Sequence, residues 1–178
     1  MKTIVPTIAL AAALAIGALP ILADNGNAPL AGLAGQVRHQ LVMIPYYSVF
    51  DDLSFSIDNG VVTLSGDVTL PVVKQDAQSA VKRIPGVTAV VNNIKVLPLL
   101  DSDYQIRRAE YRAIFGYADL YRYALGALPS IHIIVDNGHV TLVGVVNSQA
   151  DKQMANIRAN SVPGVFSVTN NLRVAERS

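Results

Sequence analysis

The sequence predicts an α+β protein that consists of two tandem copies of one small domain. Three observations support this prediction: a long internal repeat, a hairpin signal in each copy, and a helical pattern that ends at Pro-Gly in each copy. Residues 58–68 recur as residues 136–146, at a spacing of 78. In the same register, Pro85-Gly86 returns as Pro163-Gly164, and Asn92-Asn93 returns as Asn170-Asn171. A match of this length in one register indicates a duplicated domain.

Each copy contains a β-hairpin. In the first copy, apolar residues at 53, 55 and 57 alternate with serines up to an Asp-Asn-Gly turn at 58–60. Alternation resumes after the turn, with Val62 and Leu64 beside Thr63 and Ser65. Alternating residues on both sides of a two-residue turn are a strong hairpin signal. The second copy repeats this pattern around residues 136–138.

A helix and a final strand follow each hairpin. The first of these helices begins at Pro71, which suits the first helical turn, and the second spans residues 148–160 with a start near Asp151. Pro-Gly ends each helix and leads into a last strand at 87–96 or 165–174. Another helix precedes each hairpin, at 33–43 and 103–115.

Each αββαβ copy should form a three-stranded mixed sheet, because a helical crossover normally joins parallel strands. Both helices then pack on one face of the sheet and leave the other face open. The predicted boundaries are a first domain at 33–98, a linker at 99–102 and a second domain at 103–175.

The N-terminus has the pattern of a cleavable signal peptide over residues 1–23, followed by a linker at 24–32. Lys2 precedes an apolar run that reaches Leu19, and Ala23 is a suitable residue before a cut. The run is short for a membrane span of about 20 residues. An uncleaved N-terminal anchor is the alternative, because Ile21 is unusual three residues before a cleavage site. Export to the periplasm, or otherwise out of the cytoplasm, is expected.

Composition excludes several classes of function. Without Lys2, basic and acidic side chains balance at 13 each, so nucleic-acid binding is not expected. The chain has no cysteine, which excludes disulfides, thiol chemistry and a lipoprotein anchor. Its histidines, His39, His132 and His139, do not have the spacing of a metal site.

No catalytic motif is present in the sequence. Aspartates 51, 52, 101 and 103 lie at predicted element boundaries, where linker residues and helix caps are typical. We therefore expect no enzyme activity, no cofactor and no small-molecule substrate.

The hairpin motif N-G-x-V-x-L-x-G-x-V, followed by a helix, a P-G-V turn and an N-N strand, resembles the BON domain. Two such copies behind a signal peptide are similar to exported, osmotically inducible periplasmic proteins with tandem BON domains. The resemblance covers roughly residues 33–175. It implies a non-enzymatic envelope protein whose domains associate with phospholipid membranes. The second copy departs from the pattern, because residues 115–129 are longer than their counterpart, so residue equivalences are less certain before Ile131.

The open sheet faces of the two copies differ in polarity. Polar residues of the first copy, Ser54, Ser56, Ser65 and Asp67, are replaced in the second by His132, Ile134, Val143 and Val145. Exposed apolar patches on small domains are usually contact surfaces. Three interpretations stay open: packing between the two domains, a lipid or protein partner, or coverage by the long insertion.

Tyrosines and arginines gather at the start of the second copy. Tyrosine rings beside arginines suit the boundary between lipid headgroups and acyl chains. The alternative is that the tyrosines fill the space between helix and sheet and that the arginines are simply solvated. The candidate lipid-binding residues are Tyr104, Arg108, Tyr111, Arg112, Phe115, Tyr117, Tyr121 and Arg122.

The sequence thus favours an exported protein that binds phospholipid membrane surfaces and acts in envelope maintenance or stress protection. The alternative is a protein-interaction or holdase-like module of the periplasm that uses the apolar sheet face of the second copy.

Overall fold

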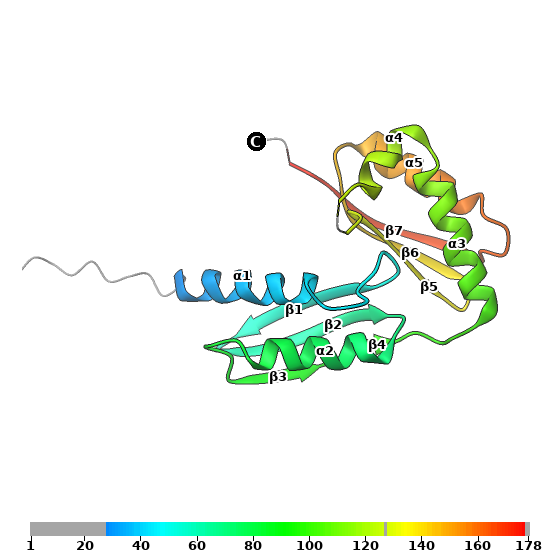
Figure 1. Cartoon of the computed structure of the whole chain (residues 1–178). Coiled ribbons are helices and arrows are strands. Elements are labelled where there is room, and N and C mark those ends of the chain that lie inside the picture. Colours follow the sequence, from blue (N-terminus) through cyan, green and yellow to red (C-terminus); the bar gives the residue numbers. More distant parts are fainter. Residues whose placement is uncertain (1–27, 127, 177–178) are drawn as a thin grey trace, which may run out of the picture.

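The computed structural model describes residues 28–126 and 128–176. The predicted signal peptide lies outside the described residues. Figure 1 shows two units, each built on its own sheet, with the N-terminal unit in blue to green and the C-terminal unit in green to red.

The first domain forms a mixed sheet in the order β1-β2-β3, and β4 also pairs with β2. β1 and β2 form the predicted antiparallel hairpin, whereas β3 and β4 run parallel to β2. β3 and β4 correspond to the single last strand that the sequence predicts. The elements are α1 (Ala28–Val42), β1 (Asp52–Asp58), β2 (Val61–Val68), α2 (Pro71–Lys82), β3 (Ala89–Asn92) and β4 (Lys95–Val96).

The second domain repeats this arrangement in a sheet of order β5-β6-β7. β5 pairs antiparallel with β6, and β7 runs parallel to β6. The elements are α3 (Asp101–Phe115), α4 (Ala118–Tyr121), the 3-10 helix η1 (Arg122–Ala124), β5 (Ile131–Asp136), β6 (His139–Val146), α5 (Gln149–Asn160) and β7 (Ser167–Val174). The prediction of an α+β fold with two αββαβ units is confirmed.

Each sheet buries the face that carries its alternating apolar residues. In the first domain, Val62 and Leu64 are fully buried and pack with residues of α1 and α2 such as Val37 and Ala77. The opposite face stays polar, and the hydroxyls of Ser54 and Ser65 lie 3.0 Å apart on it. Both helices therefore cover one face, as the crossover argument predicts.

The Asn-Asn motif joins the last strand to the preceding helix in both domains. The side-chain amide of Asn92 donates to the carbonyl of Lys74 at 3.0 Å, and that of Asn170 donates to the carbonyl of Lys152 at 2.8 Å. The side-chain oxygens of both asparagines also accept the N–H two residues further on, each at 3.2 Å. The first asparagine of each pair thus has the backbone partners that a buried amide requires.

We expect Asn170→Ala to destabilise the second domain by about 1–2 kcal/mol, because it removes two hydrogen bonds and leaves a partly buried N–H without its partner. Asn171→Ala is the matched control, since Asn171 is exposed. Urea unfolding followed by circular dichroism measures both changes. Equal losses in the two variants would show that the helix–strand contact contributes nothing specific.

Two aspartates assigned above to linkers or helix caps have a different role. The carboxylate of Asp103 is fully buried and accepts the N–H groups of Asn137 and Gly138, at 2.8 and 2.9 Å, in the β5–β6 turn. Asp51 is also fully buried and accepts from the backbone and hydroxyl of Thr69. Both carboxylates bind backbone groups of loops in the sheets and neither caps a helix, although Asp51 does lie in the linker between α1 and β1.

The insertion at 115–129 is tied to the start of α5 by Tyr123. Its hydroxyl donates to the carboxylate of Asp151 at 2.8 Å and accepts the N–H of Asn147 at 2.8 Å. Ser148, and not Asp151, is the N-cap of α5, because its hydroxyl oxygen accepts the N–H of Asp151. Tyr123 and Leu120 of the insertion are therefore buried within the core of the second domain.

The segment between α1 and β1 connects the two domains. Val49 packs within the core of the second domain, and its carbonyl accepts the N–H of Ile133 at 2.8 Å. The carbonyl of Asp51 lies 2.6 Å from Nδ1 of His132, whose ring stacks on Tyr47 with 5.6 Å between centroids. The two sheets are thus held together through strand β5.

Candidate functional site

Helix α3 has a buried face and an exposed face of contrasting chemistry. Its inner side carries Ile106, Ile114 and Phe115, which pack on the sheet. Its outer side carries Tyr104, which is 57% exposed, and the exposed arginines Arg108 and Arg112. The helix therefore presents a tyrosine and two cations to solvent.

The outer face of α3 borders a shallow groove, and the turn before β7 forms the other wall of that groove. Phe166 belongs to this turn and is 76% exposed, which is high for a phenylalanine ring. We call this region the α3 groove. Its lining includes Tyr104, Arg108, Arg112, Pro163, Gly164 and Phe166.

Phe166 was not among the residues proposed from the sequence. The equivalent residue of the first copy is Thr88. The replacement of threonine by phenylalanine was the available signal, but residue 166 was assigned to the predicted last strand and was not considered as a surface residue. The ring of Phe166 lies 5.9 Å from the ring of His139, and most of the side chain is exposed to solvent. An aromatic residue thus faces the helical arginines from a separate element.

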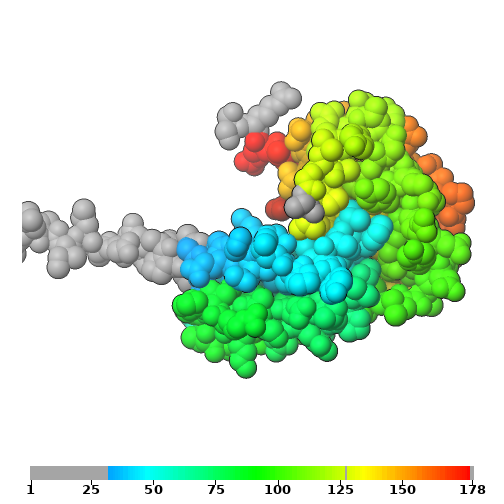
Figure 2. Space-filling view, viewed as in Figure 1, coloured from blue at the N-terminus to red at the C-terminus, as the bar shows by residue number. Residues whose placement is uncertain are grey.

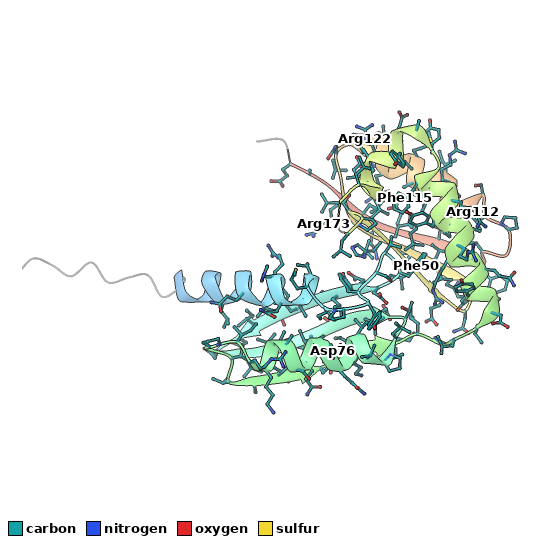
Figure 3. All side chains as sticks on the ribbon, viewed as in Figure 1. Phe50, Asp76, Arg112, Phe115, Arg122 and Arg173 are labelled. Atoms are coloured by element: carbon teal, nitrogen blue, oxygen red, sulfur yellow. The ribbon has the colours of Figure 1, made fainter. Side chains whose placement is uncertain are left out.

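Tyr111 is shared between the α3 surface and the contact between domains. Its ring meets Phe50 of the first domain at 6.4 Å and Phe115 at 4.9 Å, both edge to face. Figure 3 labels Phe50, Arg112 and Phe115 around α3. Phe115 is only 4% exposed, so its ring is a core residue and is not available to a membrane.

The remaining members of the tyrosine-arginine cluster lie apart from the α3 groove. Tyr117 is half-buried, with the guanidinium of Arg158 4.2 Å from its ring centroid. Tyr121 and Arg122 are exposed on α4 and η1, and neither lines the α3 groove. Only Tyr104, Arg108 and Arg112 of the eight proposed residues line that groove.

The four residues proposed for the apolar sheet face differ in exposure. His132 contacts Tyr47 and Asp51 of the first domain, and Ile134 is 5% exposed. Val143 is half-buried, and Val145 is 39% exposed. His132 on β5 therefore adjoins the first domain, whereas Val145 on β6 faces solvent.

Besides Asp103, α3 buries two further charged side chains, Arg107 and Glu110, which helical periodicity did not predict. Arg107 donates from Nη2 to the carbonyl of Val135 at 2.6 Å, and burial lowers its pKa. Glu110 is fully buried without a hydrogen-bond partner among the described residues, and burial raises its pKa to about 8. Glu110 is thus largely protonated at neutral pH and adds little negative charge beneath the exposed arginines.

The contact between domains also has an electrostatic component at its solvent edge. Lys95 Nζ lies 2.5 Å from the carboxylate of Asp136, and both side chains are partly exposed. The hydrogen bond to Asp136 raises the pKa of Lys95. Such an exposed ion pair contributes about 0–1 kcal/mol, so it adds little to the stability of the contact between domains.

Neither a metal centre nor a membrane span appears in the described part of the chain. Residues 28–126 and 128–176 contain no group of three or more histidine, cysteine, aspartate or glutamate side chains that could hold a metal ion. No helix within these residues combines the length and the apolar character needed to cross a membrane.

Comparison with known proteins identifies the repeated unit. The model of the BON domain matches residues 30–98, which span the first copy, and residues 122–176, which span the second copy from η1 onward without α3. The chain is 33% identical over 133 residues to Osmotically-inducible protein Y of Escherichia coli (strain K12). That alignment covers 68% of this chain and 61% of the relative, so this chain spans under two thirds of the relative's length.

Two solved structures of CdsD, a structural protein of the type III secretion system of Chlamydia trachomatis, also align with the chain. They share 15% and 13% identity with it, cover 82% and 81% of it, and are themselves covered to 94% and 98%. Their TM-scores are 0.30 and 0.29, too low to establish a shared fold. The family match rests on the two BON segments, which together cover more than half of the chain: the chain belongs to the BON domain family.

Proposed function

We propose that this protein is an exported envelope protein that binds the surface of phospholipid membranes through the α3 groove. The observation that supports this proposal is the convergence of two exposed aromatic rings, Tyr104 and Phe166, with two exposed arginines on one surface. Guanidinium groups bind phosphates, and amphipathic rings favour the boundary between headgroups and acyl chains.

Export is the second part of the proposal. It is supported by the apolar N-terminal segment and by Ala23, after which we place the cleavage site. The similarity to an osmotically inducible protein supports a role in the response of the envelope to osmotic stress. The activity is binding without catalysis, because contact with a lipid surface requires no reacting group.

Arg108→Glu with Arg112→Glu should weaken association with anionic vesicles by tenfold or more, since each basic residue near such a surface contributes about 1 kcal/mol. Added salt should weaken binding of the unmodified protein, because salt screens exposed charges. Co-sedimentation with phosphatidylglycerol-containing and pure phosphatidylcholine vesicles measures both effects.

Lys82→Glu with Arg83→Glu is the matched control, because it makes the same change in charge on exposed residues of the first domain. Val143→Ser with Val145→Asp tests the alternative function, a protein-interaction or holdase-like face on the second sheet. Unchanged vesicle binding by the α3 variant, together with loss in the sheet variant, would contradict the assignment of the α3 groove.

A further inference from the structure

The two domains differ in what lies along the free edge of their first strand. β1 and β5 are both edge strands, because each sheet is ordered with its hairpin strand outermost. Edge strands present unpaired backbone groups that can bond to another extended chain. Such an edge can therefore be a binding site. A contact at the edge of one copy indicates which position of the other copy is available to a partner.

The hairpin register shows which groups face outward. Asp58 and Val61 flank a two-residue turn in β1–β2, and antiparallel partners alternate between bonded and non-bonded pairs from there. Leu53, Phe55 and Ile57 fall on the non-bonded positions. Their N–H and C=O groups thus point away from β2. The same counting in the second hairpin places the N–H of Ile133 outward.

In the second domain this outward position is occupied. The N–H of Ile133 donates to the carbonyl of Val49 at 2.8 Å, so the turn before β1 supplies the acceptor at this position of the β5 edge. The equivalent residue of the first copy, at the spacing of 78, is Phe55. Among the described residues, no backbone group is bonded to the N–H of Phe55 across this edge.

The β1 edge lies in a groove with a basic rim. Leu53, Ser54 and Phe55 line it, together with Leu41 and Arg38 of α1 and Arg173 of β7. Figure 2 shows open space between α1, in blue, and the end of β7, in red, and Figure 3 shows Arg173 between the two domains. We call this hollow the β1 groove.

Both arginines of the β1 groove are exposed, and within the described residues neither guanidinium has a carboxylate within 4.0 Å. The other lining side chains carry no charge at neutral pH, since they are apolar, seryl or tyrosyl. Acidic groups would therefore find complementary charge on both walls, and an extended backbone would find donors and acceptors on β1.

We propose that the β1 groove binds an extended acidic segment of a partner protein, which adds as a strand to the edge of β1 between Arg38 and Arg173. Backbone hydrogen bonds provide the pairing, and the two arginines select for carboxylates. This site is separate from the α3 groove and does not depend on lipid binding.

The probe for this site is a fluorescein-labelled octapeptide of alternating valine and glutamate, with the lysine version as its charge control. Fluorescence anisotropy should show binding of the glutamate peptide alone. Arg38→Glu with Arg173→Glu should reduce its affinity by about tenfold, since exposed ion pairs contribute up to about 1 kcal/mol each. Lys82→Glu with Arg83→Glu should leave the affinity unchanged.

Backbone pairing is tested independently of charge. Methylation of one alternate set of the peptide's amide nitrogens should abolish binding, whereas methylation of the other set should not. In the protein, nitrogen-15 amide shifts should change at Leu53, Phe55 and Ile57. Failure of the glutamate peptide to bind, or shifts confined to other elements, overturns the proposal. If the Arg38 and Arg173 changes reduce binding to phosphatidylglycerol vesicles instead, the groove serves the membrane and the proposal is wrong.

Discussion

Gly144→Ala should destabilise the second domain by at least about 3 kcal/mol, the largest effect that we expect from any single substitution in this chain. Gly144 has a φ of +128°, which side chains of L-residues rarely adopt. A Cβ at this position would also overlap the carbonyl oxygen of Ser130. Urea unfolding of the variant, followed by circular dichroism, gives the loss in the free energy of unfolding.

Gly32→Ala is the matched control. Gly32 lies within α1, and a Cβ there would have no atom within 4 Å. Alanine has the higher helix propensity, so this change should be neutral or stabilise by up to about 1 kcal/mol. A Gly144→Ala protein that unfolds at the same urea concentration as Gly32→Ala would show that Gly144 and Ser130 are not as close as described.

The second large effect is a pH dependence of stability that arises from Glu110. Burial raises the pKa of this carboxyl to about 8 in the folded state, whereas the unfolded chain should have an ordinary pKa near 4.5. The folded state then holds a proton that the unfolded state has lost. Stability is therefore fully present below about pH 4.5 and is lost as the pH rises to about 8, by an amount on the order of 3–5 kcal/mol.

Glu110→Gln should remove this dependence, because glutamine has a similar shape and does not titrate. The variant should resemble the unmodified protein near pH 4.5 and be more stable at pH 8. Glu176→Gln, at the only other glutamate of the chain and exposed, should leave the profile unchanged. Parallel stability profiles of the unmodified and Glu110→Gln proteins from pH 4.5 to 9 would contradict a buried, protonated Glu110.

Local signals predicted most of the fold. The alternation around the Asp-Asn-Gly turns predicted both hairpins, because turn chemistry and period-two burial act within a few residues. The helices also lie near their predicted ranges, although α1 begins at Ala28 instead of residue 33. The break between β3 and β4 was not predicted, since it depends on the contact of Asn92 with α2.

Tertiary contacts account for what sequence reasoning missed in the candidate site. Helical periodicity places Phe115 on the same side of α3 as Tyr104, so it could not show that Phe115 is in the core. Phe166 joins the α3 groove from a turn more than 50 residues away, so no helical periodicity includes it. Burial of Glu110 likewise depends on the packing of α3 against the rest of the second domain.

The most direct test of the lipid-binding account uses a single tryptophan as a reporter of insertion. The chain has no tryptophan, so Phe166→Trp introduces one emission signal at the α3 groove. Tyr46→Trp is the matched control, because Tyr46 is 71% exposed on the first domain. The indole ring favours the membrane interface, where its emission shifts to the blue.

The account predicts that phosphatidylglycerol-containing vesicles shift the emission of Phe166→Trp to the blue, and that brominated acyl chains quench it. Tyr46→Trp should show neither change under the same conditions. A blue shift and quenching in Tyr46→Trp, with unchanged emission from Phe166→Trp, would contradict the α3 groove as the surface that meets the membrane.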